Sequence, residues 1–261
     1  MIIDGRIMAR EVLARTKARA AKLPRRPKVV AYAFSATPAT RSYLNIKKRS
    51  AEAAGCDFEV REALPLAFDT DAVIVQLPLP EGMNTKAILD SIPVEKDADV
   101  LSSAARAAFE MKGFVNLSLL PPVVGAVKEI LEFGRVEIKG KKAVVIGAGF
   151  LVGAPVAAWF KQQGAEVTHV SFRSGGFSAL RDADIIVSGA GSPHFIKPGM
   201  LKEGAVLIDA GTSESGGALA GDADPSCAEI CSIFTPVPGG VGPLAVACLF
   251  ENAVTLAERN L

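Results

Sequence analysis

An apolar run that ends at closely spaced glycines constrains the fold of this chain more than any other feature. The run from Ala143 to Ile146 is typical of a buried parallel strand, and Gly147, Gly149 and Gly153 follow it. Gly147 permits a tight turn, Gly149 lets an anionic group approach the backbone, and Gly153 lets the next helix pack closely on the strand. Because free N–H groups at the start of that helix attract phosphate, the spacing predicts a dinucleotide-binding fold that begins only after a long block of chain.

Composition excludes several classes of function. The net charge of +1 over 261 residues provides no field for nucleic acid or for an anionic membrane, so we expect neither as a partner. The first residues lack the regions of a signal peptide, and no apolar run reaches the roughly 20 residues that span a bilayer. The four cysteines are scattered, and Cys227 and Cys231 lack a second ligand pair. We therefore expect free thiols in a reducing cytoplasm, and no metal.

Apolar strands alternate with helical segments along the chain, which predicts parallel sheets in an α/β fold. We expect helices at 7–22, 40–54, 85–91, 122–133, 152–163 and 243–258, and strands at 29–34, 72–77, 142–146, 165–171, 184–188, 205–209 and 232–234. This order predicts two α/β lobes around a cleft, the second a Rossmann-type dinucleotide-binding domain. The expected domains are residues 1–118 plus 243–261, which carry the substrate chemistry, and residues 119–242, which bind the nucleotide.

Tyr43 and Lys47 stand four residues apart in the predicted helix 40–54, so a phenol and an amine share one face. Taken alone, the pair is also consistent with an exposed amphipathic helix, since lysine is usually solvated. The functional alternative is one wall of a cleft, where partial burial tunes the lysine toward neutrality. Short-chain dehydrogenases also carry Tyr-x-x-x-Lys, but their glycine motif precedes that pair, whereas here it follows.

Three further strings are candidates for a ligand site. Gln76 lies at the C-terminal end of the predicted strand 72–77, and ligands bind at the carboxyl ends of strands in open α/β sheets. The segment from Pro93 to Asp99 adds carboxylates on a loop at the next crossover. The string from Thr235 to Pro243 contains three glycines and three prolines, which specify a rigid backbone path against which a ligand could lie. A capping amide, a solvated acidic turn and an interdomain hinge are the structural alternatives.

Together, these strings resemble the methylenetetrahydrofolate dehydrogenase/methenyltetrahydrofolate cyclohydrolase family. The likeness extends from Ile3 to Asn252. Its carriers, in chain order, are Thr40-x-x-Tyr43-x-x-x-Lys47, Val75-Gln76-Leu77-Pro78-Leu79-Pro80, Pro93-x-x-Lys96-Asp97-x-Asp99, Gly140-Lys141, Gly147-x-x-x-x-Val152-Gly153-x-Pro155 and Thr235 to Pro243.

The resemblance implies two successive reactions on a folate substrate. A nicotinamide cofactor oxidises 5,10-methylenetetrahydrofolate to 5,10-methenyltetrahydrofolate, which water then opens to 10-formyltetrahydrofolate. The resemblance gives the proton chemistry of hydrolysis to Lys47, whose pKa should be lowered for that role, and the holding of that lysine to Gln76. It also implies that Tyr43 stacks on the folate and that Asp99 binds the pterin, which completes the expected catalytic residues. The substrate is further expected to contact Pro238, Gly239 and Gly240.

The cofactor motif departs from the family pattern. The family commonly has Gly-Arg-Ser at the glycine turn, where the arginine helps to meet a 2′-phosphate, and Gly147-Ala148-Gly149 lacks it. However, the next strand ends without an acid for a free ribose 2′-hydroxyl, and Arg173 and Ser174 are placed to bind a phosphate. We therefore expect NADP, with NAD as the alternative. The expected cofactor-binding residues are Gly147, Ala148, Gly149, Val152, Gly153, Arg173, Ser174, Ala190, Gly191 and Thr212.

The substrate side departs as well. Family members usually have glycine after the pterin-binding carboxylate, whereas Val100 follows Asp99 here. Two alternatives to a bifunctional enzyme remain: a monofunctional dehydrogenase, and a nucleotide-binding regulatory protein with a degenerate folate pocket. Retention of Lys47 and Gln76 argues against the first. The resemblance also implies a homodimer.

Overall fold

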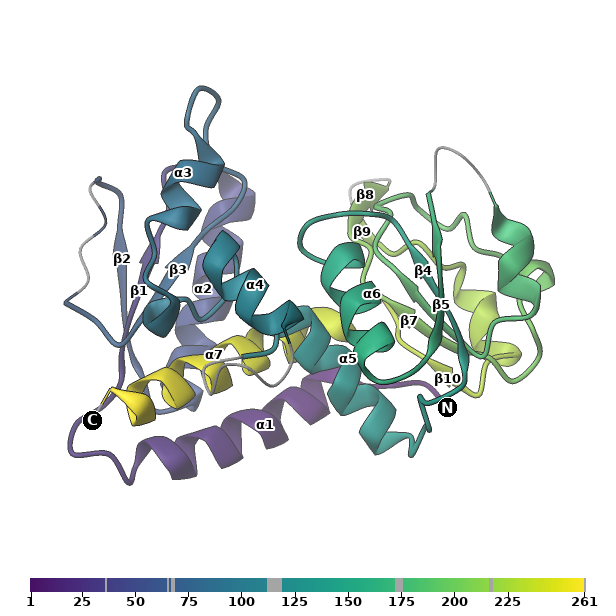
Figure 1. Cartoon of the computed structure of the whole chain (residues 1–261), viewed down its shortest axis with the longest axis horizontal. Helices are drawn as coiled ribbons and strands as arrows, with labels where there is room; N and C mark the ends of the chain where they lie inside the picture. Colours follow the sequence, from purple (N-terminus) through teal and green to yellow (C-terminus); the bar gives the residue numbers. More distant parts are fainter. Residues whose placement is uncertain are drawn as a thin grey trace. The chain divides into compact units, whose positions relative to one another are not determined.

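The computed structural model describes residues 1–35, 37–64, 66, 69–111, 119–171, 176–215 and 218–260. The chain divides into two compact units, each with its own parallel sheet (Figure 1). The N-terminal unit contains residues 9–122 and 246–261, and the central unit contains residues 1–8 and 123–245. The first eight residues therefore group with the glycine turn, although the sequence led us to expect them in the other lobe.

The N-terminal unit is built on a three-stranded parallel sheet with the order β2-β1-β3. Strands β1 (Lys28–Tyr32) and β3 (Ala72–Val75) are apolar and almost wholly buried, as expected. The edge strand β2 (Asp57–Arg61) is largely exposed, and its three charged residues alternate with Phe58 and Val60, the period-2 pattern of a strand, which is too short here to have been recognised from the sequence. Its helices are α1 (Gly5–Ala20, whose first residues belong to the central unit), α2 (Pro38–Ala53), α3 (Thr85–Asp90) and α4 (Ser103–Glu110), with a 3₁₀ turn at Val94–Lys96.

Helix α2 has clear sequence boundaries. The side chain of Thr37 caps its start by accepting a hydrogen bond from Thr40 N at 3.1 Å, and Pro38 occupies the first turn. The helix ends before Gly55, whose φ of +78° suits glycine. These signals fix the register of the face that carries Tyr43 and Lys47.

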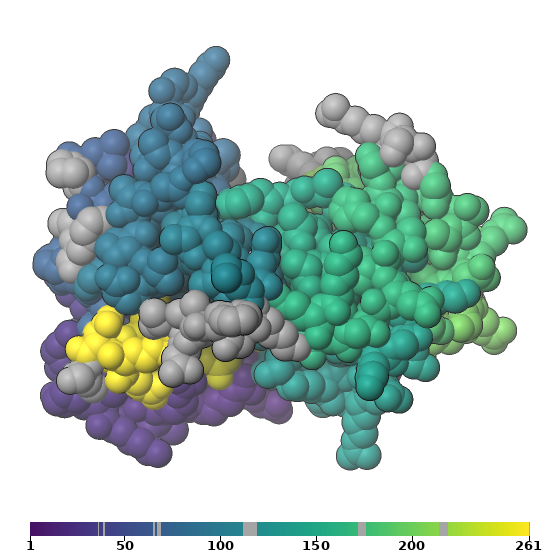
Figure 2. All heavy atoms as spheres, viewed as in Figure 1, coloured from purple at the N-terminus to yellow at the C-terminus, as the bar shows by residue number. Residues whose placement is uncertain are grey.

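The C-terminal helix α7 (Val241–Arg259) lies beside α1 (Figures 1 and 2). Ion pairs join them: Arg15 Nε lies 3.0 Å from Glu251 Oε1, and Arg19 lies 3.7 Å from Glu251 Oε1 through Nη1 and 2.6 Å from Glu258 Oε2 through Nη2. Among the described residues, α7 is the helix long and apolar enough to span a membrane by those measures alone. Since 61% of its apolar window is buried within the protein, it packs as a core helix.

The central unit contains a five-stranded parallel sheet with the order β10-β7-β6-β4-β5. Numbered along this unit, the order is 2-1-3-4-5, which places a topological switch point between β4 and β6, where ligands bind in sheets of this kind. The strands are β4 (Lys142–Ile146), β5 (Glu166–Val170), β6 (Ile185–Ser188), β7 (Val206–Asp209) and β10 (Ile233–Phe234), with a small antiparallel pair β8 (Ser213–Ser215) and β9 (Ala218–Ala220). The helices are α5 (Pro122–Phe133) and α6 (Gly153–Gln162), with 3₁₀ turns at Phe177–Arg181, Pro198–Met200 and Pro225–Glu229.

Candidate active site

Lys47 and Gln76 come together at the carboxyl edge of the N-terminal sheet. Lys47 Nζ donates a 3.0 Å hydrogen bond to Gln76 Oε1. The main chain and the other end of the amide hold Gln76 in place: its backbone N–H donates to Tyr32 O at 2.8 Å, and its Nε2 donates to Leu77 O at 2.8 Å. Because Nε2 is already engaged, Oε1 is the atom that faces the lysine.

The surroundings of Lys47 favour its neutral form. The residue is half-buried, and burial lowers the pKa of its ammonium below the ordinary lysine value, while the carboxylate of Asp99 acts in the opposite direction. Burial also raises the pKa of Asp99, which Lys47 and Arg106 partly counteract and Asp97 reinforces. The lowered lysine pKa has the direction expected from the sequence. The cluster therefore holds an amine that can gain and lose a proton closer to neutrality.

Asp97 organises the loop that carries Asp99. It is buried, and its Oδ2 accepts backbone N–H groups from Leu101 at 2.9 Å and from Ser102 at 2.7 Å. Ser102 then caps α4 by accepting from Ala105 N at 3.2 Å. The residues after Asp99 are therefore an ordered turn and helix, not an open polar loop. Sequence reasoning named Asp97 but did not give it this framework role.

Val100 occupies a backbone position that normally selects glycine. Its φ is +55°, in the left-handed region that a β-branched residue rarely adopts, and its side chain is buried with 1% exposed. Burial of the side chain offsets the backbone strain. A glycine at this position, which the resemblance gives as usual, would adopt this φ without strain.

A matched pair of variants measures the strain at Val100. We expect both Val100→Ala and Val100→Gly to be less stable than the wild type, because each removes buried methyl groups. At an ordinary position the alanine variant would be the more stable of the two. Here we expect the free energy of unfolding of Val100→Gly to exceed that of Val100→Ala by about 1 kcal/mol, because glycine adopts a positive φ without the steric cost of a Cβ. Urea unfolding of the two variants checks the order, and a more stable alanine variant would show that Val100 is unstrained.

Tyr43 lies one turn before Lys47 on α2 and is 44% exposed. Its ring is therefore open to solvent on the side of the helix that carries the lysine, as a surface that stacks on a planar ligand must be. Tyr43, Lys47, Gln76 and Asp99 all belong to the N-terminal unit.

The glycine turn of the central unit has the geometry expected of a phosphate-binding loop. Gly147 adopts a φ of +92°, and a Cβ on Gly153 would lie 1.8 Å from Gly147 O, so the start of α6 meets the turn in direct backbone contact. A Cβ on Gly149 would meet nothing within 4 Å, which leaves open space beside its main chain. Val152 precedes α6 without a side-chain cap, so the helix start can receive an anion.

The ends of β6 and β7 supply the other predicted cofactor residues. Gly189, which follows β6, packs on the glycine turn, because a Cβ on Gly147 would lie 2.8 Å from Gly189 O. Ala190 is half-buried, and a Cβ on Gly191 would lie 3.9 Å from Thr212 O, so Gly191 and Thr212 are neighbours. Ala148 lies within the turn itself. Arg173 and Ser174 lie outside the described residues.

The string from Thr235 to Pro243 owes part of its glycine content to internal packing. Gly239 adopts a φ of +111°, and a Cβ there would lie 2.8 Å from the Arg6 guanidinium. A Cβ on Gly240 would lie 2.7 Å from Pro236 O. Pro238 is exposed, whereas both glycines are buried. Contact of these three residues with a substrate therefore stays a prediction.

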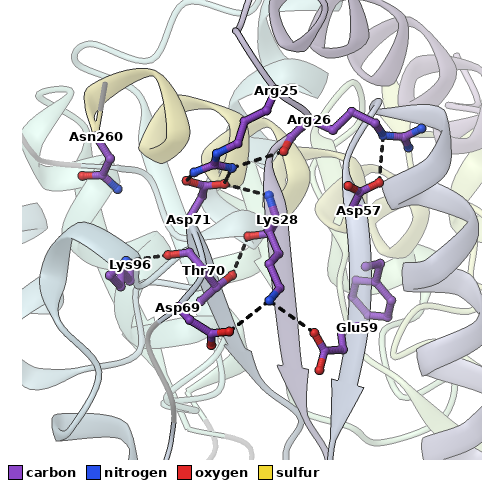
Figure 3. A pocket seen from close by; sticks show the side chains of 11 residues that line it. Arg25, Arg26, Lys28, Asp57, Glu59, Asp69, Thr70, Asp71, Lys96 and Asn260 are labelled. Atoms are coloured by element: carbon purple, nitrogen blue, oxygen red, sulfur yellow. Dashed lines mark hydrogen bonds and ion pairs between the residues drawn. The ribbon is translucent and has the colours of Figure 1, made fainter.

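A groove at the opposite, amino edge of the N-terminal sheet is lined by charged side chains (Figure 3). These charges satisfy one another: Arg25 Nη1 lies 2.6 Å from Asp71 Oδ2, and Lys28 Nζ lies 3.1 Å from Asp69 Oδ2. Lys96 Nζ donates to Thr70 O. These interactions join the starts of the strands to one another. We therefore assign the candidate site to the carboxyl edge of the sheet and not to this groove.

Comparison with known proteins agrees with this geometry. Residues 121–261 match the model of the tetrahydrofolate dehydrogenase/cyclohydrolase NAD(P)-binding domain. The bifunctional protein FolD of Thermotoga petrophila is 38% identical over 282 aligned positions, which cover 100% of this chain and 99% of that protein. The chain belongs to the tetrahydrofolate dehydrogenase/cyclohydrolase family.

Solved structures of the family share the fold of this member. The bifunctional FolD enzyme of Campylobacter jejuni superposes with a TM-score of 0.93 at 28% identity, covering 100% of this chain and 99% of that one. The Trypanosoma brucei enzyme, solved with NADP and an inhibitor, superposes with a TM-score of 0.91 at 30% identity, covering 100% and 98%. The predicted α/β fold with a Rossmann-type dinucleotide-binding domain is thereby confirmed.

Proposed function

We propose that this protein oxidises 5,10-methylenetetrahydrofolate with NADP and hydrolyses the resulting 5,10-methenyltetrahydrofolate to 10-formyltetrahydrofolate. The observation that carries the bifunctional assignment is the hydrogen bond between Lys47 and Gln76, because it presents an amine of lowered pKa at the carboxyl edge of the sheet. Hydride transfer by a monofunctional dehydrogenase does not require a proton acceptor at this position.

Hydrolysis requires the removal of a proton from water as its oxygen bonds to the methenyl carbon. Neutral Lys47 takes that proton, and the resulting ammonium is stabilised by Gln76 Oε1 and by the negative charge of Asp99. The adduct's hydroxyl then becomes the formyl carbonyl as the bond from the carbon to the ring nitrogen breaks; that nitrogen retains the electron pair and takes up one proton, in balance with the proton that the hydroxyl releases. Gln76 acts here by orienting the lysine, since its own amide does not titrate.

Oxidation uses the central unit, where NADP supplies the hydride acceptor when it is bound. Open space beside Gly149 and the uncapped start of α6 fit a pyrophosphate, while Gly147 and Gly153 keep the turn compact. The loops after β6 and β7 carry Ala190, Gly191 and Thr212 at the same edge of the sheet. Arg173 and Ser174 are proposed to select the 2′-phosphate.

A coupled assay tests this function. With 5,10-methylenetetrahydrofolate as substrate, we expect reduction of NADP to exceed reduction of NAD, and we expect added 5,10-methenyltetrahydrofolate to lose its absorbance in the presence of the enzyme. A preference for NAD would contradict the cofactor assignment. If the absorbance of 5,10-methenyltetrahydrofolate falls no faster with the enzyme than without it, the protein is a dehydrogenase without hydrolase activity. Tight NADP binding with no folate turnover would favour a regulatory protein.

Family membership also supports a proposal for the location and the assembly of the enzyme. We propose that the enzyme is cytoplasmic, where its four cysteines, all buried and none in a disulfide, would remain reduced. We also propose a homodimer formed through the central unit, which sedimentation or light scattering can check.

A further inference from the structure

Asp222 is buried beneath the loop that follows β6. No part of its surface is exposed, and its carboxylate accepts three hydrogen bonds from residues 188–192. Oδ2 accepts from Ser188 Oγ at 2.6 Å and from Ala190 N at 2.7 Å, while Oδ1 accepts from Ser192 N at 2.7 Å. A single side chain therefore fixes the backbone on both sides of Gly191.

Asp209, the last residue of β7, is the counterpart of Asp222. It is 1% exposed, and its carboxylate accepts from Gly211 N at 2.9 Å and from Ala223 N at 2.8 Å. The register pairs Asp209 with Ser188 at the ends of adjacent strands. Burial and the charge of Asp222 raise the pKa of Asp209 to about 6.

Two glycines make room for this carboxylate pair, Asp209 and Asp222. A Cβ on Gly211 would lie 2.2 Å from Asp222 Cγ, and a Cβ on Gly221 would lie 2.2 Å from Asp209 Oδ2. The carboxylate of Asp222 thus packs on the backbone just after Asp209, and the carboxylate of Asp209 packs on the backbone just before Asp222. Burial of two neighbouring carboxylates costs free energy, because each charge loses its hydration. Apolar residues would fill this part of the core at a lower cost, which indicates that the carboxylates have another role.

The loops held by the pair are those that carry the proposed cofactor contacts. Residues 189–192 contain Ala190 and Gly191, and residues 210–212 contain Thr212. The first loop packs on the glycine turn through Gly147 and Gly189. The backbone N–H groups of Ala190 and Ser192 are held by the buried carboxylate of Asp222 and are not left to bind water.

We propose that Asp222, seated against Asp209, is a positioning residue that presets the loop after β6 for the nicotinamide cofactor. The inference rests on the proposed function, which supplies the cofactor, but adds a residue that touches neither substrate nor cofactor. Its effect is on cofactor affinity, because a loop that is ordered before binding loses less conformational freedom when the cofactor arrives. Hydrolysis needs no cofactor and uses residues of the N-terminal unit, so it should be independent of Asp222.

Asp222→Asn tests the inference with little change in volume. An amide presents one oxygen and one NH₂ group, so in either orientation the N–H of Ala190 or of Ser192 loses its acceptor. We expect calorimetric titration to show that NADP binds at least about tenfold more weakly than to the wild type. In activity assays, the KM for NADP should rise with kcat much less affected, and the hydrolysis rate should stay within about twofold of the wild type.

Two further variants separate positioning from general support of the fold. Ser188→Ala removes a hydrogen bond to the same carboxylate but leaves both loop amides paired, so NADP affinity should change by less than about threefold. Asp224→Asn, at a half-buried acid paired with Lys197, is the matched control and should bind NADP normally. Unchanged NADP affinity in Asp222→Asn would overturn the inference, as would equal losses of NADP binding and hydrolysis with a lowered melting temperature.

Failure of the inference and failure of the proposed function give different results. A wild-type protein that binds NADP without turning over folate would contradict the proposed function, while the three NADP affinities would still decide the role of Asp222. Conversely, full folate turnover with equal NADP affinity in Asp222→Asn would retain the function and remove the positioning role.

Discussion

Replacement of Lys47 by methionine is expected to remove hydrolysis of 5,10-methenyltetrahydrofolate while leaving the fold intact. Methionine keeps a long apolar stem on α2, so the packing of the half-buried side chain is largely preserved. Loss of the proton acceptor should lower the rate by about 10²- to 10⁴-fold. Reduction of NADP with 5,10-methylenetetrahydrofolate should be affected far less, because hydride transfer needs no proton acceptor at that position.

Two comparisons identify the property of Lys47 that matters. Lys47→Arg retains a positive charge and a donor for Gln76 but cannot become neutral, so we expect hydrolysis to be lost as in the methionine variant. Lys48→Met, at the exposed neighbouring position, is the matched control and should hydrolyse normally. An active arginine variant would show that the charge of Lys47, and not its proton transfer, supports the reaction.

The pH dependence of hydrolysis follows from the same group. The neutral fraction of Lys47 increases as the pH rises through its pKa. Because burial lowers that pKa, the increase occurs at a lower pH than for an ordinary lysine. The wild-type rate should therefore rise with pH and level off, and Lys47→Met should lose that rise.

The fold was predictable where local signals were strong and unambiguous. The apolar runs of β4, β6 and β7 and the proline at the start of α5 gave those elements to within a residue or two. The strand β2 was missed although charged and apolar residues alternate along it, because it is only five residues long and carries just two apolar side chains, Phe58 and Val60. Helix α4 was missed because it is only eight residues long, although Ser102 provides a cap and its buried residues Ala105 and Phe109 stand one helical turn apart.

The candidate site divides in the same way. Lys47, Gln76 and the three glycines of the turn could be predicted because their positions in the sequence, one helical turn apart, at the end of a strand or at fixed glycine spacing, indicate a chemical role. Asp222 was not found, because its role depends on packing between residues distant in the sequence. The one available signal was an acid directly after the apolar run of β7, at Asp209, where a buried charge requires partners.

Two alanine substitutions in the glycine turn should have opposite kinds of effect. In Gly153→Ala the new Cβ would lie 1.8 Å from Gly147 O, a backbone atom that cannot move without displacing the turn from α6. We expect a loss of stability of about 3 kcal/mol or more, together with loss of NADP binding. In Gly149→Ala the Cβ would meet nothing within 4 Å, so thermal stability should stay within about 0.5 kcal/mol of the wild type.

Gly149→Ala is the more informative member of the pair, because it changes the site without disturbing the fold. The open space beside Gly149 is where a pyrophosphate can approach the main chain, and a methyl group there would hold it away. NADP binding should weaken about tenfold or more, while hydrolysis of 5,10-methenyltetrahydrofolate continues. Melting curves and NADP titrations of both variants provide the check. Normal NADP affinity in a stable Gly149→Ala protein would mean that the pyrophosphate does not lie against this turn, even though Gly153 is needed to build it.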